Sequence, residues 1–357
     1  MGMDTAGRLG GLLGLEHPVV QGPFGGGMSS VALAAAVSEA GGLGSFGAHH
    51  LRPDAITSLV KELRAATGRP FAVNLWVPQP GEQEAAATAA DVARVHPYYA
   101  ELGLPDPATE HRTPDFAEQL DALIAAAPPV ISLVMGVPPR HAVDEARRRG
   151  IVLIGTATTV AEAVALEAAG VDAVVASGSD AGGHRGAFLA PVRESLVGTF
   201  ALVPQVADAV AVPVIAAGGI TDGRGLAAAL VLGADAVQIG TGFLACTESA
   251  ASEVHRRALL SPGAATTVLT RLFSGRTARG IANRFVRELA AHEDAVPPYP
   301  AQNALMLPLR AEAAARGRSD LVNLWAGQAA ALSVGGPAAD YLAAVLADAE
   351  RLLGRPL

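Results

Sequence analysis

Lysine is almost absent from this chain of 357 residues. Lys61 is the only one, and arginine supplies the other 25 of the 26 basic residues. An enzyme that works through a Schiff base needs a lysine in its site, whereas Lys61 lies in SLVKELRAA, the pattern of a solvated helix. This disfavours Schiff-base chemistry. The single cysteine, Cys246, excludes an internal disulfide and any CxxC metal or iron–sulfur site, and we expect it to be a small buried apolar side chain.

An excess of basic charge and long apolar runs are also missing. The net charge is −8, which argues against nucleic acid as a partner because phosphate binding rests on surface Lys and Arg. No run approaches the roughly 18 apolar residues of a membrane span, and the N-terminus lacks a signal-sequence pattern. The nine histidines form no HxxxH or HxH pair beside carboxylates. We therefore expect a cytoplasmic protein with no metal site and no membrane partner.

What the sequence does contain is a regular alternation of short apolar segments and alanine-rich amphipathic helices. Eight apolar segments lack polar alternation, as expected of strands buried on both faces of a parallel sheet: 18–21, 42–46, 71–76, 130–135, 151–156, 171–176, 212–217 and 236–240. Helical patterns cover 29–40, 54–67, 139–149, 159–169 and 223–232. Ser29 is placed to cap the first of these helices, and a glycine follows four of them.

Eight strand–helix units favour an α/β fold of the closed (β/α)8 barrel type, with a doubly wound open sheet as the alternative. The glycine-rich turns follow the sixth, seventh and eighth strands, where barrels commonly bind phosphate. A dinucleotide-binding fold would place such a turn after the first strand. We assign residues 1–77 and 115–248 to the barrel. Residues 78–114 and 249–357, which show mostly helical patterns and no strand signals, are expected to form a smaller helical lobe covering the mouth.

Two glycine-rich turns predict a phosphate site. One turn contains Gly218 and Gly219, and the other runs through Gln238, Ile239, Gly240 and Thr241. Glycine lets backbone N–H groups approach a ligand with no Cβ in the way, and a following helix N-terminus favours an anion. Either turn alone could be an ordinary tight βα loop. Their positions on adjacent late strands, in a chain with one lysine, favour a backbone cradle for a phosphorylated cofactor.

His184 is the candidate catalytic residue. It lies in SGSDAGGHRG at 177–186, flanked by Gly182 and Gly183, and an imidazole titrates near neutral pH. Arg185 is expected either to pair with Asp180 or to anchor an anion.

Other polar residues at strand ends would line the same mouth. Asn74 interrupts the apolar third strand, and a buried amide needs a partner. Gln21 and Gly22 end the first strand. His49 and His50 follow the second strand, so at most one of them could face the mouth. We expect them to lie behind the residues that contact a ligand, or at the surface.

These motifs resemble the nitronate monooxygenase family, formerly called 2-nitropropane dioxygenases. The resemblance covers nearly the whole chain and includes QGPFGGG at 21–27, FAVNL at 71–75, the SDAGGHRG loop, AAGGITDG, QIGTGFLACTES, FSGRTARGIANRF at 273–285, PPYPAQNAL at 297–305 and LWAGQ at 324–328. It implies an FMN-dependent (β/α)8 barrel with a helical second domain. The implied reaction is the oxidation of alkyl nitronates by dioxygen to carbonyl compounds and nitrite, without metal.

The resemblance also implies residue roles. Asn74 would contact the flavin ring, Gly182 would line it, and Gly219 with 238–241 would hold the phosphate. His184 would take the α-proton of a neutral nitroalkane or hydrogen-bond a nitronate, and Gln302 and Trp325 would face the site. The chain departs from the family at Ser177, where Gln is usual, and at Asp180, where Glu is usual.

Three alternatives stay open. An FMN-dependent NAD(P)H enoyl reductase and an NADH:quinone reductase share the barrel, the FMN cradle and the histidine. A flavin-binding module without turnover is the non-enzymatic alternative. A homodimer is compatible with all of these functions.

Overall fold

The computed structural model describes residues 7–82, 84–110 and 113–357, so residues 1–6, 83, 111 and 112 of the expected domains lie outside the described part. Eight parallel strands form one sheet in the order β1-β9-β8-β6-β5-β4-β3-β2. They are β1 (Val19–Gln21), β2 (Gly44–Gly47), β3 (Phe71–Trp76), β4 (Val130–Val134), β5 (Val152–Ala157), β6 (Ala173–Ser177), β8 (Val214–Ala217) and β9 (Ala236–Ile239).

The two ends of this sheet meet. The Gln21 N–H donates to the Leu43 carbonyl at 2.9 Å, and the Leu43 N–H donates to the Val19 carbonyl at 2.9 Å, so β1 pairs with Leu43, the residue directly before β2. This closure confirms the (β/α)8 barrel and excludes the open doubly wound sheet.

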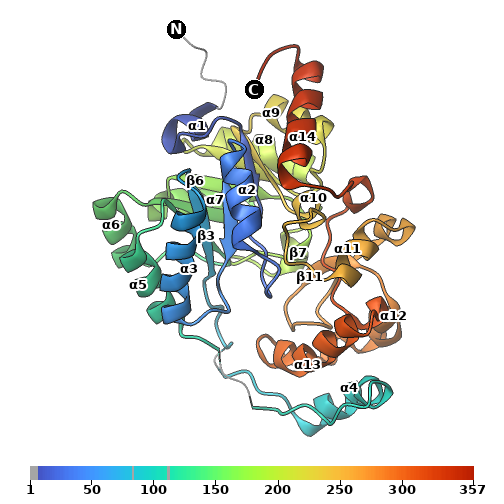
Figure 1. Cartoon of the computed structure of the whole chain (residues 1–357). Helices are drawn as coiled ribbons and strands as arrows, with labels where there is room; N and C mark the ends of the chain where they lie inside the picture. The colour runs from blue at the N-terminus through green and yellow to red at the C-terminus, as the bar shows by residue number, and fades with distance from the viewer. Residues whose placement is uncertain (1–6, 83, 111–112) are drawn as a thin grey trace.

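Helices surround the barrel (Figure 1). They are α1 (Gly7–Leu13), α2 (Val31–Glu39), α3 (Pro53–Ala66), α5 (Phe116–Ala126), α6 (Arg140–Arg149), α7 (Val160–Ala169), α8 (Thr199–Ala209), α9 (Gly223–Val231), the short α10 (Thr241–Leu244) and α14 (Ala338–Leu353). Leu9 and Leu13 of α1 join inward-facing strand residues such as Val20 and Ile215 in the barrel's inner apolar cluster. Helix α1 therefore covers the amino-terminal end of the barrel and leaves the carboxyl ends of the strands for a site.

Helix ends follow local chemistry, with one correction. The predicted cap Ser29 does not start α2: its Oγ accepts from the Phe24 and Gly47 N–H groups. Ser30 is the N-cap instead, and its Oγ accepts from the Leu33 N–H at 2.9 Å. At a helix C-terminus, Gly150 follows α6 in the left-handed conformation that ends the helix, as predicted.

The prediction that 249–357 lacks strands was wrong. Strands β10 (Thr267–Thr270) and β11 (Ala278–Ile281) form an antiparallel sheet with β7 (Gly183–His184). These pairings place the SDAGGHRG loop against the C-terminal segment, a contact that short runs of sequence do not reveal.

The remaining elements outside the barrel are α4 (Ala89–Glu101), α11 (Glu253–Leu259), α12 (Arg284–Leu289), α13 (Ala301–Ala315) and the 3₁₀ turns η1 (Val192–Glu194), η2 (Pro262–Ala265), η3 (Ala290–Ala295), η4 (Ser319–Leu321) and η5 (Ala330–Leu332).

The chain returns to the barrel at its C-terminal end. Helix α14 packs on α9 and α2. Helices α14 and α9 lie side by side in Figure 1. The Tyr341 hydroxyl of α14 donates to the Thr221 carbonyl at 2.5 Å, and a Cβ on Gly242 would lie 1.9 Å from that hydroxyl. Residues 249–357 thus contribute both to the elements outside the barrel repeat and to the ring of helices around the barrel.

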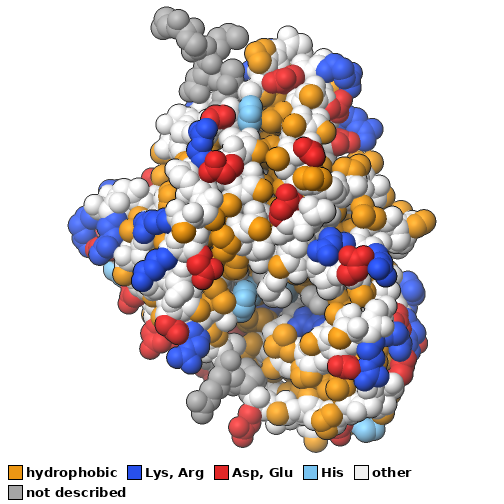
Figure 2. All heavy atoms as spheres, in the orientation of Figure 1, with side chains coloured by type: hydrophobic (Ala, Val, Ile, Leu, Met, Phe, Trp, Pro, Cys, Tyr) orange, Lys and Arg blue, Asp and Glu red, His pale blue; other side chains and the backbone are white. Residues whose placement is uncertain are grey.

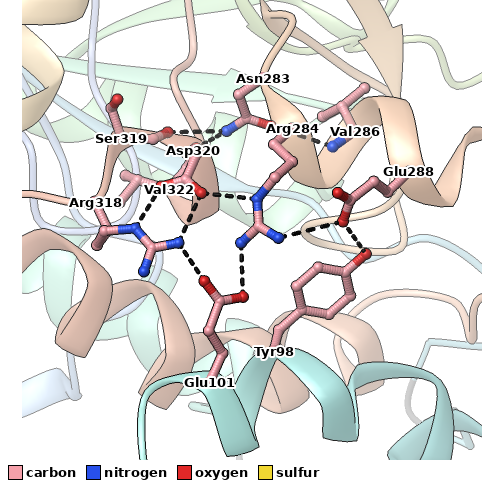
Figure 3. A network of polar contacts seen from close by, with 10 residues as sticks. All are labelled: Tyr98, Glu101, Asn283, Arg284, Val286, Glu288, Arg318, Ser319, Asp320 and Val322. Atoms are coloured by element: carbon pink, nitrogen blue, oxygen red, sulfur yellow. Dashed lines mark hydrogen bonds and ion pairs between the residues drawn. The ribbon is translucent and has the colours of Figure 1, made fainter.

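Ion pairs hold the inserted helix α4 against the C-terminal segment (Figure 3). Glu101 accepts from Arg284 at 2.8 Å and from Arg318 at 2.5 Å, and both arginines also pair with Asp320 at 2.8 Å. The Tyr98 hydroxyl donates to Glu288 at 2.9 Å. The two segments outside the barrel repeat are therefore in direct contact.

The surface shows no basic patch on the face in Figure 2, where acidic and basic side chains are interspersed. Within the described residues, no helix is both long enough and apolar enough to cross a membrane.

Candidate active site

Strand register gathers the predicted glycine turns at the carboxyl end of the barrel. Gln21 aligns with Ile239, Gln238 aligns with Ala217, and Ala217 aligns with Ser177. The residues that follow these strands therefore lie side by side. A Cβ on Gly22 would lie only 3.3 Å from the Gly240 Cα, so the first and last turns touch along their backbones.

Four N–H groups of these turns are free. The N–H groups of Gly218, Gly219, Gly240 and Thr241 donate to no described residue, and none of the four residues is fully buried. Gly218 and Gly219 have φ values of +108° and +69°, which a residue with a Cβ rarely adopts. Free backbone donors on adjacent turns are the usual means of holding a phosphate.

Asp180 fixes one of these turns from behind. Its Oδ2 accepts from the Thr199 N–H at 2.7 Å and from the Thr199 hydroxyl. The Thr199 Oγ1 also lies 2.9 Å from the Gly218 carbonyl oxygen. Asp180 therefore performs a structural task here, and it does not pair with Arg185. The Arg185 guanidinium donates instead to the carbonyls of Gly178 and Ser177, at 2.7 and 2.9 Å.

The two predicted amides differ in what they leave available. The Gln21 side chain is fully buried, accepts from the Ser45 N–H at 2.8 Å and donates to the Gly22 carbonyl, so the barrel itself uses both of its polar atoms. The Asn74 Nδ2 donates to the carbonyl and hydroxyl oxygens of Ser132. The Asn74 Oδ1 accepts from no described residue and stays available, two residues before the end of β3.

His184 stands between the only two tryptophans of the chain. Its ring centroid lies 4.9 Å from that of Trp76, at the end of β3, and 5.4 Å from that of Trp325. The segment that carries Trp325 packs tightly on the glycines before His184, because a Cβ on Gly182 would lie 2.5 Å from the Gly327 nitrogen. Glycine is thus required at position 182 because the backbone of residues 326–327 leaves no room for a Cβ.

One nitrogen of His184 has a fixed partner. Its Nε2 lies 2.8 Å from Ser274 Oγ, and that hydroxyl donates to the Arg276 carbonyl at 3.1 Å. With the single hydroxyl hydrogen directed at the Arg276 carbonyl, we assign Ser274 as the acceptor of His184 Nε2–H. This leaves a lone pair on Nδ1, which has no hydrogen bond with a described residue. Burial, together with the charges of Arg276 and Arg310, lowers the pKa of His184 to about 3, so the imidazole is neutral at physiological pH.

Arg276 connects the inserted segment to this histidine. Its guanidinium pairs with Glu82, through Nε to Oε1 at 2.5 Å, and both side chains are largely buried. It lies 4.6 Å from the Tyr299 ring centroid and 5.4 Å from that of Trp76. Side chains from three separate parts of the sequence, 76–82, Arg276 and Tyr299, thus gather around Trp76, the neighbour of His184.

Comparison with known proteins identifies the family. A family model described as nitronate monooxygenase matches residues 7–348. The chain belongs to the nitronate monooxygenase family. It is 39% identical over 350 residues to a probable nitronate monooxygenase of Staphylococcus aureus strain Newman, covering 97% of this chain and 98% of that protein.

Two solved structures are similar to this chain along nearly their whole length. Nitroalkane oxidase from Streptomyces ansochromogenes is 40% identical with a TM-score of 0.88, covering 97% of this chain and 99% of that one. FabK from Thermotoga maritima is 31% identical with a TM-score of 0.77, covering 98% and 97%. The protein is accordingly an oxidoreductase of the nitronate monooxygenase family.

In this family member, His49 lies behind Trp76, the neighbour of His184, which is one of the two positions expected for it. Its ring stacks on Trp76 at 3.6 Å with an interplanar angle of 1°, and its buried Nδ1 has no partner among the described residues. Burial, with the charges of His50, His184 and Arg276, lowers the pKa of His49 well below its usual value. His50 is exposed, as expected. A Cβ on Gly25 would lie 2.6 Å from the His49 Cε1, a contact across 24 positions that no local sequence pattern indicates.

The lobe residues implied by the family resemblance have distinct surroundings. Trp325 is the aromatic neighbour of His184 described above. Gln302 in α13 donates from Nε2 to the Leu272 carbonyl at 2.6 Å, and its buried Oε1 has no described partner.

The single cysteine lies away from this chemistry in character. Cys246 is buried, and removal from water raises the pKa of its thiol to about 12. This confirms Cys246 as an apolar packing residue.

Proposed function

We propose that this protein oxidises alkyl nitronates, and neutral nitroalkanes after their deprotonation, with dioxygen to a carbonyl compound and nitrite, using FMN. The observation that carries this proposal is a neutral imidazole with a free lone pair, placed between two indole rings at the same barrel mouth as four free N–H groups. A small planar substrate suits a site whose base has two aromatic neighbours. The likeness to a nitroalkane oxidase points the same way.

The residues at the mouth fit FMN. The free N–H groups of Gly218, Gly219, Gly240 and Thr241 would hold the phosphate, and the side chains and backbone of Gln238 and Ile239 would form the adjoining wall. Asn74 Oδ1 is a free acceptor for a ring N–H. The remaining predicted cofactor neighbours, Gly22, Ser177, Gly182 and Gly183, end or follow strands at the same mouth, whereas Gln21 would act by holding Gly22. FMN, when bound, would supply the electron acceptor.

The chain's own residues would handle the proton. Nδ1 of His184 would take the α-proton of a neutral nitroalkane, leaving an anionic nitronate beside an imidazolium. Ser274 keeps the hydrogen on Nε2 and so presents the basic nitrogen to substrate. A preformed nitronate needs no such transfer. Because Nε2–H is engaged with Ser274, the neutral imidazole has no second donor for the nitronate oxygens.

The segments outside the barrel repeat, 78–114 and 249–357, would together cover the mouth and keep water from the reacting atoms. Two contacts support this covering role: the ion pair between Glu82 and Arg276, and the tight packing of Gly182 against residues 326–327.

An anaerobic mixing experiment tests the proposal. The purified protein should release FMN on denaturation, and a nitronate should bleach the bound flavin while NADH and NADPH leave it oxidised. Admission of dioxygen should then release nitrite. Bleaching by NADPH, followed by reduction of an enoyl thioester or a quinone, would overturn the proposal in favour of the reductases. Absence of FMN from the purified protein would remove the proposed cofactor.

A further inference from the structure

One part of the C-terminal segment, 324–328, joins the last glycine turn of the barrel to the SDAGGHRG loop. The Gly327 N–H donates to Thr241 Oγ1 at 3.0 Å, and the Gln328 N–H donates to the Asp180 carbonyl at 2.9 Å. The packing at this junction is close, because a Cβ on Gly327 would lie 2.9 Å from the Asp180 carbonyl oxygen. Residues 324–328 therefore touch both the turn and the loop.

The same residues carry Trp325, whose ring centroid lies 5.4 Å from that of His184. On the side away from the barrel, the Trp325 carbonyl lies 2.9 Å from Nε2 of the buried His255. The next N–H, of Ala326, donates to the Arg279 carbonyl at 3.2 Å. Among the described residues, Thr241 supplies the one hydrogen bond from a barrel side chain to 324–328. Its hydroxyl thus holds the backbone two residues after Trp325.

The Thr241 hydroxyl still has a hydrogen to donate. Its oxygen accepts from Gly327, and its single hydrogen has no acceptor among the described residues. The Thr241 N–H is free as well. A hydroxyl that donates to an anion becomes a stronger acceptor, because successive hydrogen bonds polarise one another. A phosphate on this turn would therefore strengthen the bond from Gly327 to Thr241.

We propose that Thr241 is a positioning residue whose hydroxyl binds the cofactor phosphate and the Gly327 N–H together, so that phosphate binding fixes Trp325 beside His184. The inference rests on the proposed function for its cofactor, FMN. It assigns two tasks to one side chain. The hydrogen serves the cofactor, and the oxygen holds the aromatic neighbour of the base. The site for the substrate is then fully assembled only when the phosphate is in place.

Riboflavin, which has the ring system of FMN without its phosphate, isolates this effect. We would remove FMN from the purified protein, reload it with FMN or with riboflavin at saturation, and measure amide hydrogen exchange in residues 324–328 by mass spectrometry. In the wild type, exchange at Gly327 and Gln328 should be about 2- to 10-fold slower with FMN than with riboflavin, the usual effect of one neutral hydrogen bond.

Three variants connect the effect to the hydroxyl. Thr241→Val keeps the shape of the side chain but cannot accept from Gly327, so FMN and riboflavin should give equal exchange. Its affinity for FMN should fall by about 10- to 100-fold, the usual range for a hydrogen bond to a charged group, and its affinity for riboflavin should not. Thr241→Ser should restore both properties. Thr57→Val is the matched control, since it removes a half-buried hydroxyl of α3 that donates to the Pro53 carbonyl at 3.2 Å, and it should behave as the wild type.

The outcomes separate this inference from the proposed function. Equal exchange with FMN and riboflavin in the wild type, or a difference that persists in Thr241→Val, would overturn the role of Thr241 even where nitronates are oxidised. A protein that binds neither flavin would overturn the inference together with the proposed cofactor. If the difference depends on Thr241 but nitronates leave the flavin oxidised, the positioning role stands and the proposed reaction fails.

Discussion

At the scale of single residues, the neutral state of His184 sets the first expectation. His184→Asn should lower kcat/KM for neutral nitroalkanes by about 10²- to 10⁴-fold, the usual loss when a general base is removed. Preformed nitronates should be affected much less, because their α-proton is already gone. FMN content, measured on the released chromophore, should not change. Equal losses with both substrates would show that the imidazole only orients them.

Ser274 should act through His184. Ser274→Ala removes the acceptor of Nε2–H, so the imidazole can adopt either tautomer and presents the basic nitrogen less often. We expect a loss of about 10- to 100-fold in kcat/KM for nitroalkanes, smaller than the loss of the base itself. Ser274→Thr keeps the hydroxyl and should restore most of it. A purely structural role would lower nitronate and nitroalkane turnover together, so the ratio of the two is the measurement that decides.

Sequence analysis predicts a site residue when the signal for it lies in the residues next to it along the chain. The glycine turns and His184 stand out because glycines surround them within a few positions. Ser274 and Arg276 were not predicted, since their importance comes from contacts with His184 and Glu82 across 90 and 194 positions. The assignment of individual residues to FMN stays a prediction. Gln21 shows the limit of strand-end reasoning, because its amide faces Ser45 inside the barrel.

At the scale of elements, periodicity located the barrel well and the other segments poorly. All eight barrel strands fall within or beside the predicted segments, because buried parallel strands are continuous apolar runs. Strands β10 and β11 escaped, since four-residue antiparallel strands such as Ala278–Ile281 (ARGI) contain polar residues and carry little periodic signal. Nothing in the local pattern of α14 indicates that it returns to the barrel after the lobe.

The ion pairs between Glu101 of α4 and two arginines of the C-terminal segment give a prediction for this helix. Glu101→Gln weakens the ion pairs with Arg284 and Arg318, and partly exposed pairs contribute about 0–1 kcal/mol each. Global stability should therefore fall by about 1 kcal/mol or less, while amide hydrogen exchange in Ala89–Glu101 should become faster. Glu145→Gln is the matched control: it removes a carboxylate paired with Arg148 and Arg149 inside one helix. Unchanged exchange in α4 would mean that apolar packing alone holds this helix.

At the scale of the whole molecule, buried neutral histidines should make the fold sensitive to acid. Burial lowers the pKa of His184 to about 3 and that of His255 to about 4, whereas an unfolded histidine titrates near 6.5. Between these values the unfolded chain binds protons that the folded protein does not bind. Stability is thus fully present above about pH 6.5 and declines as the pH falls towards the folded-state values.

One histidine can be separated from the rest of this acid response. Each unbalanced proton changes the free energy of unfolding by about 1.4 kcal/mol per pH unit. His184→Asn should therefore reduce the loss of stability between pH 6.5 and 5.0 by about 1.5 kcal/mol, measured by denaturant unfolding at matched FMN occupancy. His141→Asn, which removes an exposed histidine, should leave the wild-type slope. If His184→Asn also leaves that slope, the imidazole already carries a proton in the folded protein near pH 6, and it could not serve as the resting base of the proposed reaction.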